Sequence, residues 1–169
     1  MIQTIVSDFS RVLLFPIDPE YRGGLNALHA KLSASGEYNV WEHFRLNQEL
    51  LALYAELGRG MPIYLFSSEY IQEDPMIWSA LDGIFRDTFS AARLDLKKDD
   101  PAAYASIAAS VGVEPRSVLY IDDQQMHVDA AARVGMATIR FMSNGQAMRD
   151  IRHCLESVGG GDWGGALRH

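Results

Sequence analysis

The chain has 169 residues and a formal net charge of −7, with 48% hydrophobic and 22% charged residues, which is a composition typical of one globular domain. Its lysines and arginines are scattered, so the composition argues against nucleic acid or an anionic membrane as the main partner, because both need a clustered basic surface.

The first half of the chain contains two apolar runs that predict buried strands. Residues 2–7 and residues 62–66 show little polar alternation, as expected for strands that are covered on both faces. Between them, residues 46–57 place leucines and a tyrosine on one helical face, and Gly58 follows as a stop. We therefore expect a strand, a helix and a second strand in this half.

The second half repeats the alternation of helix and strand. Asp100 and Pro101 predict a helix start and Gly112 its end. Further strands and helices are expected at residues 117–121, 128–135, 137–141 and about 144–157. This order predicts an α/β fold with a parallel sheet, helices on both faces, and ligands at the carboxyl ends of the strands. We expect one domain over residues 1–158 and a flexible glycine-rich tail over residues 159–169.

The predicted location is cytoplasmic. The single cysteine, Cys154, excludes an internal disulfide and fits a reducing compartment. The chain enters a predicted strand almost at once, without the basic and apolar segments of a signal peptide. No uninterrupted apolar run reaches the length of a membrane span, so we expect no membrane partner.

Polar residues that can carry chemistry stand at or near the ends of the predicted strands. They are Asp8, the pair Ser67 and Ser68, the pair Asp122 and Asp123, and the pair Lys97 and Lys98. Each alone is most simply a cap or a solvated charge. Together, three acids at one sheet edge would repel one another unless a divalent cation with oxygen ligands compensates them, and Mg2+ suits carboxylates, water and phosphate. The set predicts phosphoryl chemistry with an aspartate nucleophile.

Residues 2–142 resemble the haloacid dehalogenase-like (HAD) hydrolase superfamily. The segments SDFSRVLL, IYLFSS, LDLKKDDPAAY and YIDDQQMHVDAA resemble its four motifs in order. Response-regulator receiver domains use a similar set of groups, but their acid pair comes first and their lysine last. The resemblance implies a Rossmann-like three-layer parallel sheet and a short helical cap insertion. A true dehalogenase is a further alternative, but that chemistry does not need Mg2+, so the acid pair Asp122 and Asp123 argues against it.

The resemblance also implies the role of each site residue. Asp8 would attack phosphorus and become an aspartyl phosphate, and Lys98 would offset the negative charge. Ser67 would donate a hydrogen bond to the phosphoryl group. Mg2+ would be held by Asp8, Asp123 and the main-chain carbonyl of Ser10, while Asp122 would orient a metal-bound water or act through its neighbours. The implied substrate is a small phosphorylated molecule.

Ser10 departs from the family pattern. Most phosphatases of the family carry an aspartate there, which protonates the leaving oxygen, and a serine hydroxyl cannot do this near neutral pH. The sequence therefore leaves three readings open: a slow enzyme, another group or water acting as the acid, or a non-catalytic or regulatory binding protein. Two further positions stay open as well. Arg11 either reaches an anionic substrate or faces solvent, and His127 either supports the site or lies on a helix surface.

The expected cap is short. Only residues 16–45 are available for it, with one small helix expected at residues 21–32 and a second at residues 39–44. A reduced cap excludes less water from the pocket. Such a site either takes larger substrates or is completed by a neighbouring subunit in a homodimer.

Overall fold

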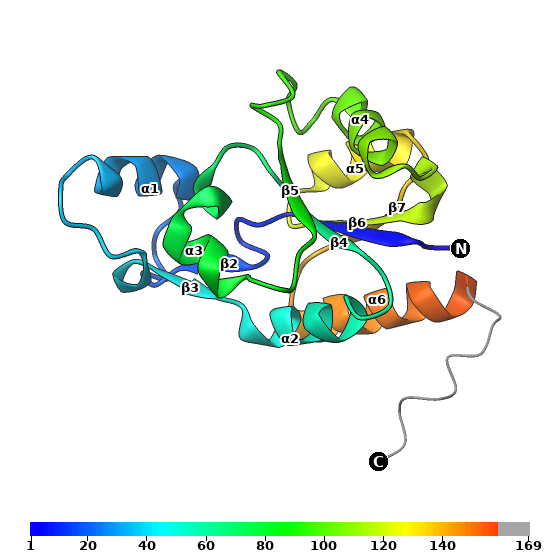
Figure 1. The fold of residues 1–169 in the computed structure, drawn as a ribbon, viewed down its shortest axis with the longest axis horizontal. Coiled ribbons are helices and arrows are strands. Elements are labelled where there is room, and N and C mark those ends of the chain that lie inside the picture. The colour runs from blue at the N-terminus through cyan, green and yellow to red at the C-terminus, as the bar shows by residue number, and fades with distance from the viewer. Residues whose placement is uncertain (159–169) are drawn as a thin grey trace, which may run out of the picture.

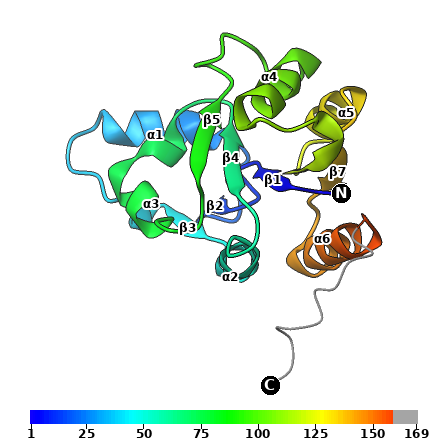
Figure 2. The same ribbon diagram turned by 45° about the vertical axis from the view of Figure 1, so that its right-hand side comes forward.

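The computed structural model describes residues 1–158, and these form three layers (Figures 1 and 2). The predicted tail at residues 159–169 lies outside the described residues. The middle layer is a five-stranded parallel sheet with the strand order β5-β4-β1-β6-β7. Its strands are β1 (Thr4–Ser7), β4 (Ile63–Ser67), β5 (Asp87–Ser90), β6 (Val118–Asp122) and β7 (Ala137–Arg140). The chain runs outward from β1 to β4 and β5, then returns to the opposite side of β1 as β6, so the switch point lies between β1 and β6.

The central strands are buried on both faces, as their apolar runs predict. Every residue of β1, β4 and β6 is buried. Alternate side chains enter two separate apolar clusters, with Ile5, Leu65 and Leu119 on one face and Val6, Phe66 and Tyr120 on the other. The predicted parallel α/β fold is confirmed.

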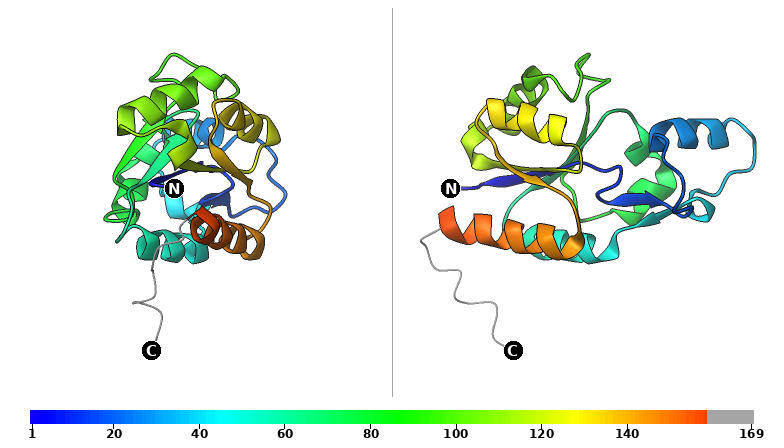
Figure 3. Two further views of the ribbon diagram at one scale, coloured as in Figure 1. Left: turned by 90° about the vertical axis from the view of Figure 1, so that its right-hand side faces the viewer. Right: turned by 180° about the vertical axis from the view of Figure 1, so that it is seen from behind.

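Two helices cover each face of the sheet. In Figure 3, α2 (Gln48–Leu57) and α6 (Asn144–Val158) lie below it, and α4 (Pro101–Val111) and α5 (Gln125–Arg133) lie above it. Small residues of α4 and α5 pack against the second cluster, which lets these helices approach the sheet closely. None of the described helices combines the length and the apolar character needed to cross a membrane.

The ends of α4 lie where the sequence predicts them. The Asp100 side chain accepts a hydrogen bond from the backbone N–H of Ala102 at 2.9 Å, and Pro101 occupies the first turn. Gly112 ends the helix with a φ of 75°, a left-handed conformation that glycine adopts without strain. Just before this start, the backbone N–H of Asp100 donates to the Lys97 carbonyl at 3.1 Å, so a turn at residues 97–100 leads into the helix.

A smaller assembly lies beyond the carboxyl ends of the strands (Figure 1). The strands β2 (Leu14–Pro16) and β3 (Phe44–Leu46) pair antiparallel, and residues 17–43 connect them. We call this connection the α1 segment, because it contains helix α1 (Leu25–Ser33) and a short 3-10 helix, η1 (Val40–Glu42). A second 3-10 helix, η2 (Ile71–Glu73), and helix α3 (Pro75–Ala80) follow β4 at the same end of the sheet.

Three elements differ from expectation. The predicted second helix at residues 39–44 is a short 3-10 helix followed by β3, and the hairpin β2–β3 was not anticipated. Strand β5 was also missed, because it is a four-residue edge strand, DTFS, whose residues are mostly not fully buried. Its sequence lacks the apolar run that marks the central strands.

Candidate active site

The adjacent strands β1 and β6 bring two carboxylates together at the switch point. Ser7 pairs with Ile121 in the parallel ladder, and the backbone N–H of Asp8 donates to the Ile121 carbonyl at 2.8 Å. Asp8 therefore leaves β1 beside Asp122, the last residue of β6. Both carboxylates are buried, with Asp8 5% and Asp122 0% exposed.

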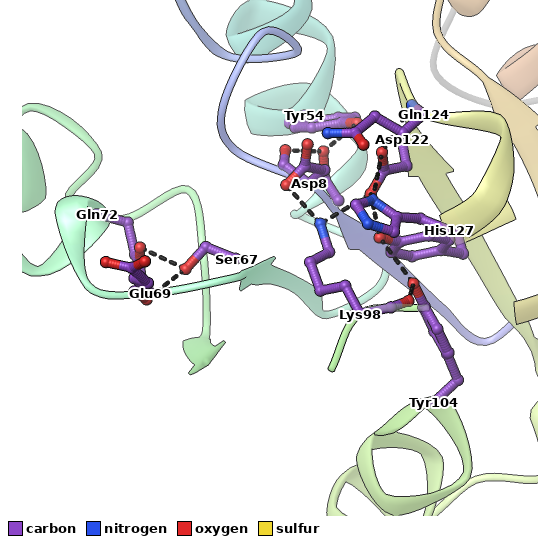
Figure 4. A network of polar contacts seen from close by, with 12 residues as sticks. Asp8, Tyr54, Ser67, Glu69, Gln72, Lys98, Tyr104, Asp122, Gln124 and His127 are labelled. Atoms are coloured by element: carbon purple, nitrogen blue, oxygen red, sulfur yellow. Dashed lines mark hydrogen bonds and ion pairs between the residues drawn. The ribbon is translucent and has the colours of Figure 1, made fainter. Parts of the chain in front are cut away.

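Lys98 joins the two carboxylates (Figure 4). Its Nζ donates to Asp8 Oδ1 at 2.7 Å and to Asp122 Oδ2 at 2.8 Å. The hydroxyl of Tyr104, on α4, donates to the Lys98 carbonyl at 2.7 Å and so anchors the lysine backbone. Burial opposes a charge on this lysine, but the two carboxylates outweigh it and raise the pKa of Lys98. The two carboxylates thus favour the charged form of Lys98 in the centre of the site.

Asp122 is surrounded by donors. Besides Lys98, it accepts from the Tyr120 hydroxyl and from the backbone N–H of Gln124 at 2.9 Å, and His127 Nδ1 lies 3.1 Å from its Oδ2. Burial opposes its ionisation, but Lys98 and His127 hold the pKa of Asp122 well below its usual range. The sequence missed Tyr120, although its place two residues before Asp122 puts both side chains on the same face of β6.

Asp123 has the opposite environment. Within residues 1–158, its Oδ1 is buried and has no hydrogen-bond partner, and the same holds for the hydroxyl of Ser10. Burial and the neighbouring Asp122 raise the pKa of Asp123. Burial also raises the pKa of Asp8 to about 7, opposed by Lys98 and reinforced by Asp122. Carboxylates held this close favour a compensating cation beyond the single lysine.

The three acids fit a hard divalent cation. One ligand oxygen from each of Asp8, Asp122 and Asp123 lies within 4.8 Å of the others. Because Asp122 already accepts from several donors, the oxygens left for a cation among residues 1–158 are Oδ1 of Asp123 and the Asp8 oxygen that Lys98 does not contact. An all-oxygen set of this kind suits Mg2+.

Ser67 lies at the same edge of the sheet but is turned away from the acids. It ends β4, is buried, and its hydroxyl is hydrogen-bonded to the Glu69 carbonyl at 2.7 Å and to Gln72 Oε1 at 2.5 Å. Figure 4 shows this hydroxyl facing Gln72 and Glu69 rather than Asp8. The structure thus brings Asp8, Lys98, Asp122 and Asp123 together, with Ser67 nearby in a separate network.

Two residues that the sequence left open have defined contacts. His127 is buried against Asp122, so it supports the site. Arg11 neither reaches the acids nor extends freely into solvent: its guanidinium donates to the Tyr21 carbonyl at 3.1 Å and to the Gly23 carbonyl at 2.9 Å. It has a positive φ of 61° and ties the turn after Asp8 to the α1 segment.

Relatives of the sequence are phosphatases by name. No protein-family model matches the chain. The enolase-phosphatase E1 of Persephonella marina is 29% identical over 114 residues, which cover 60% of this chain and 50% of the relative. The enolase-phosphatase E1 of Kluyveromyces lactis is 32% identical over 120 residues, covering 63% of this chain and 54% of the relative. The chain thus spans about half the length of the curated relatives it matches.

Solved structures share the fold over nearly the whole chain. A HAD-family enzyme from Bacteroides thetaiotaomicron, in complex with magnesium and inorganic phosphate, has a TM-score of 0.61 at 15% identity and covers 99% of this chain and 100% of its own. A HAD-superfamily hydrolase of subfamily IA from Geobacter sulfurreducens has a TM-score of 0.65 at 14% identity, covering 89% of this chain and 100% of its own. The predicted HAD-like core is confirmed.

Proposed function

Because the chain has the HAD-like fold and sequence similarity to phosphatases, we propose that it is a Mg2+-dependent phosphatase acting on a small phosphomonoester. One observation carries the proposal. The Asp8 carboxylate is buried 2.7 Å from the Lys98 ammonium, within an acid cluster whose Asp123 oxygen has no partner among the described residues. A nucleophile, a fixed cation and ligands for a divalent cation therefore share one sheet edge.

The proposed reaction proceeds through an aspartyl phosphate. An Asp8 oxygen attacks phosphorus, the bond from phosphorus to the substrate oxygen breaks, and the departing oxygen takes a proton from water to leave as the alcohol. Water then attacks the phosphoryl group, releasing inorganic phosphate and restoring the Asp8 carboxylate. Lys98 offsets the charge of the phosphoryl oxygens, and Asp122 fixes Lys98 in place. Asp8, Asp123 and the Ser10 carbonyl would hold Mg2+, which supplies further charge neutralisation when bound.

Ser10 supports a second candidate, a phosphate-binding protein without turnover. Its hydroxyl stands where an aspartate would protonate the leaving alcohol, and it has no hydrogen-bond partner within the described residues. General acid–base help is worth about 100-fold to 10,000-fold in rate, so its loss selects against substrates with poor leaving groups. A slow phosphatase and a binding protein therefore differ mainly in their turnover of activated esters.

The α1 segment is proposed as a reduced cap over this site, corresponding to the predicted insertion at residues 16–45. In Figure 1 it lies beyond the carboxyl ends of the strands. Asp8 follows β1 and Asp122 ends β6, so both stand at that edge of the sheet. A cap of this size leaves room for a larger phosphorylated substrate, or for a second subunit that completes the pocket.

The decisive experiment is release of phosphate from an activated aryl phosphate with and without Mg2+. We expect Mg2+-dependent turnover that Asp8→Asn abolishes, while Asp82→Asn, at an exposed position, leaves it unchanged. If the protein binds Mg2+ and phosphate but turns over no ester of a broad panel, the binding protein is the correct reading and the phosphatase proposal fails.

A further inference from the structure

Gln72 has a buried side-chain amide to which neither the sequence patterns nor the proposed reaction assigns a role. It belongs to η2 and is 0% exposed. Its Nε2 donates to the Glu69 carbonyl at 3.0 Å, and its Oε1 accepts from the Ser67 hydroxyl at 2.5 Å. A buried amide satisfied at both ends is held in one orientation, because turning it would bring two acceptors together.

In this arrangement the single proton of the Ser67 hydroxyl is already used in a hydrogen bond within the turn. Both neighbours of the hydroxyl, Gln72 Oε1 and the Glu69 carbonyl, are acceptors, so the proton points into the turn of residues 67–72. In Figure 4 the hydroxyl extends away from Asp8 and Lys98. Ser67 can donate to a phosphoryl group at Asp8 only after its hydroxyl leaves both Gln72 and the Glu69 carbonyl.

Helix α1 holds the turn that carries Gln72. Asn26 Oδ1 accepts from the backbone N–H of Ile71 at 3.1 Å, and His29 Nε2 lies 3.0 Å from Asp74 Oδ2. These two contacts flank Gln72 on either side in the sequence. A displacement of α1 would therefore shift the η2 turn and, with it, the Gln72 amide.

We propose that Gln72 is a positioning residue that keeps the Ser67 hydroxyl turned away from Asp8 in the ligand-free protein, and that α1 controls its release through Ile71 and Asp74. The inference rests on the proposed function, because it assigns Ser67 to the phosphoryl group. A hydrogen bond to a charged phosphoryl oxygen is about twice as strong as one to a neutral amide, so a bound phosphoryl group draws the hydroxyl away from Gln72.

The first test measures binding of inorganic phosphate in the presence of Mg2+ by calorimetry. Gln72→Met keeps the length of the side chain but removes one of the two acceptors that hold the Ser67 hydroxyl, so we expect phosphate to bind about threefold to tenfold more tightly. The Michaelis constant for an aryl phosphate should fall with it. In a Ser67→Ala background, Gln72→Met should have no such effect, because the hydroxyl it releases is gone.

Ile63→Val is the matched control, since it alters a buried residue of the same strand at the end opposite Ser67 and has no place in the proposed coupling. It should leave phosphate affinity unchanged. The inference is overturned if Gln72→Met leaves affinity unchanged or weakens it, or if the same change persists in the Ser67→Ala background.

A second measurement uses the wild-type protein and does not depend on folding of a variant. The Gln72 side-chain amide should give a slowly exchanging NMR signal, identified by its loss in Gln72→Glu. Mg2+ with saturating inorganic phosphate should shift this signal and speed its exchange, and an unchanged signal would overturn the inference.

The contribution of α1 is tested by Asn26→Ala. Removing the acceptor for Ile71 loosens the turn, so we expect tighter phosphate binding in the same direction as Gln72→Met. Lys31→Ala, on an exposed position of the same helix, should have no effect. Equal phosphate affinities of Asn26→Ala and Lys31→Ala would show that α1 does not control Ser67.

Failures of the inference and of the proposed function are distinguishable. If Gln72→Met changes phosphate binding but no ester is turned over, the phosphatase proposal fails and the role of Gln72 stands. If esters are turned over but Gln72→Met changes neither phosphate affinity nor the Michaelis constant, only the proposed role of Gln72 fails. Absence of phosphate binding overturns both.

Discussion

The Nζ of Lys98 lies 2.7 Å from Oδ1 of Asp8, and both side chains are almost completely buried. The pair is not isolated, because the same ammonium is 2.8 Å from Asp122. One lysine thus faces three acids of the cluster, Asp8, Asp122 and Asp123. This imbalance underlies two predictions about charge, one for Lys98 and one for Asp123.

Lys98→Met should destabilise the protein by about 3 kcal/mol, because it leaves buried carboxylates without their cation. The measurement is urea denaturation in the absence of divalent metal. Lys97→Met is the matched control, since Lys97 is adjacent and exposed, and it should change stability by less than about 0.5 kcal/mol. Equal losses for the two variants would show that Lys98 does not compensate the acids.

Asp123→Asn should remove the stabilisation that Mg2+ gives to the fold. At 100 times its dissociation constant, a ligand that binds only the folded state adds about 2.7 kcal/mol to stability. The wild-type melting temperature should therefore rise with Mg2+, and that of Asp123→Asn should stay nearly flat. Without Mg2+ the variant should be at least as stable as wild type, because burial and Asp122 disfavour the Asp123 charge.

Asp129→Asn removes an exposed carboxylate from the neighbouring helix and should keep the full response to Mg2+. A Mg2+ response of Asp123→Asn equal to that of wild type would place the metal elsewhere.

The meeting of Asp8, Lys98 and Asp122 could be predicted from the sequence. Apolar runs define the strands, and parallel strands present their carboxyl ends at one edge, so residues that follow them must lie close together. The helix start at Asp100 and Pro101 likewise places the pair Lys97 and Lys98 near that edge. These are consequences of local periodicity and caps, whereas the choice of Lys98 over Lys97 rests on the resemblance to the HAD motifs.

The surroundings of Ser67 could not be predicted in this way. Its orientation depends on a hydrogen bond to Gln72, in a turn without periodic pattern whose conformation is held by α1 from 45 residues away. The pairing of β2 with β3 depends similarly on a contact between two three-residue strands far apart in the sequence. Such long-range contacts between short segments leave no regular spacing of residue types.

Asp74 should make the junction between α1 and α3 sensitive to acid. Its side chain caps α3 through the backbone N–H of Met76 at 2.9 Å and also contacts His29. Partial burial opposes its ionisation, but these contacts lower its pKa below the usual 3.8. A depressed carboxyl pKa stabilises the folded protein above the unfolded value, and this contribution is lost as pH falls through the folded value.

Asp74→Ala should therefore lower the free energy of unfolding by about 1 kcal/mol near neutral pH, mostly through loss of the cap. The difference in stability between the variant and wild type should narrow as pH falls below 3.8. Chemical denaturation across this range measures it, with Asp82→Ala as the exposed control. A gap that stays constant or widens in acid would contradict the assigned contacts.

Ser10→Asp should weaken the dependence of the rate on the leaving group, because it restores a carboxylic acid at this position. In the wild-type protein, esters with poor leaving groups should react far more slowly than aryl esters, because no carboxylic acid protonates the departing oxygen. An aspartate at this position should raise the rate on an alkyl phosphate by about 100-fold, the lower end of what general acid help provides, and change the aryl rate much less. Ser10→Ala, which adds no acid, should leave the ratio of the two rates unchanged. If Ser10→Asp fails to raise the alkyl rate while the aryl rate is retained, another group or a bound water already supplies the proton.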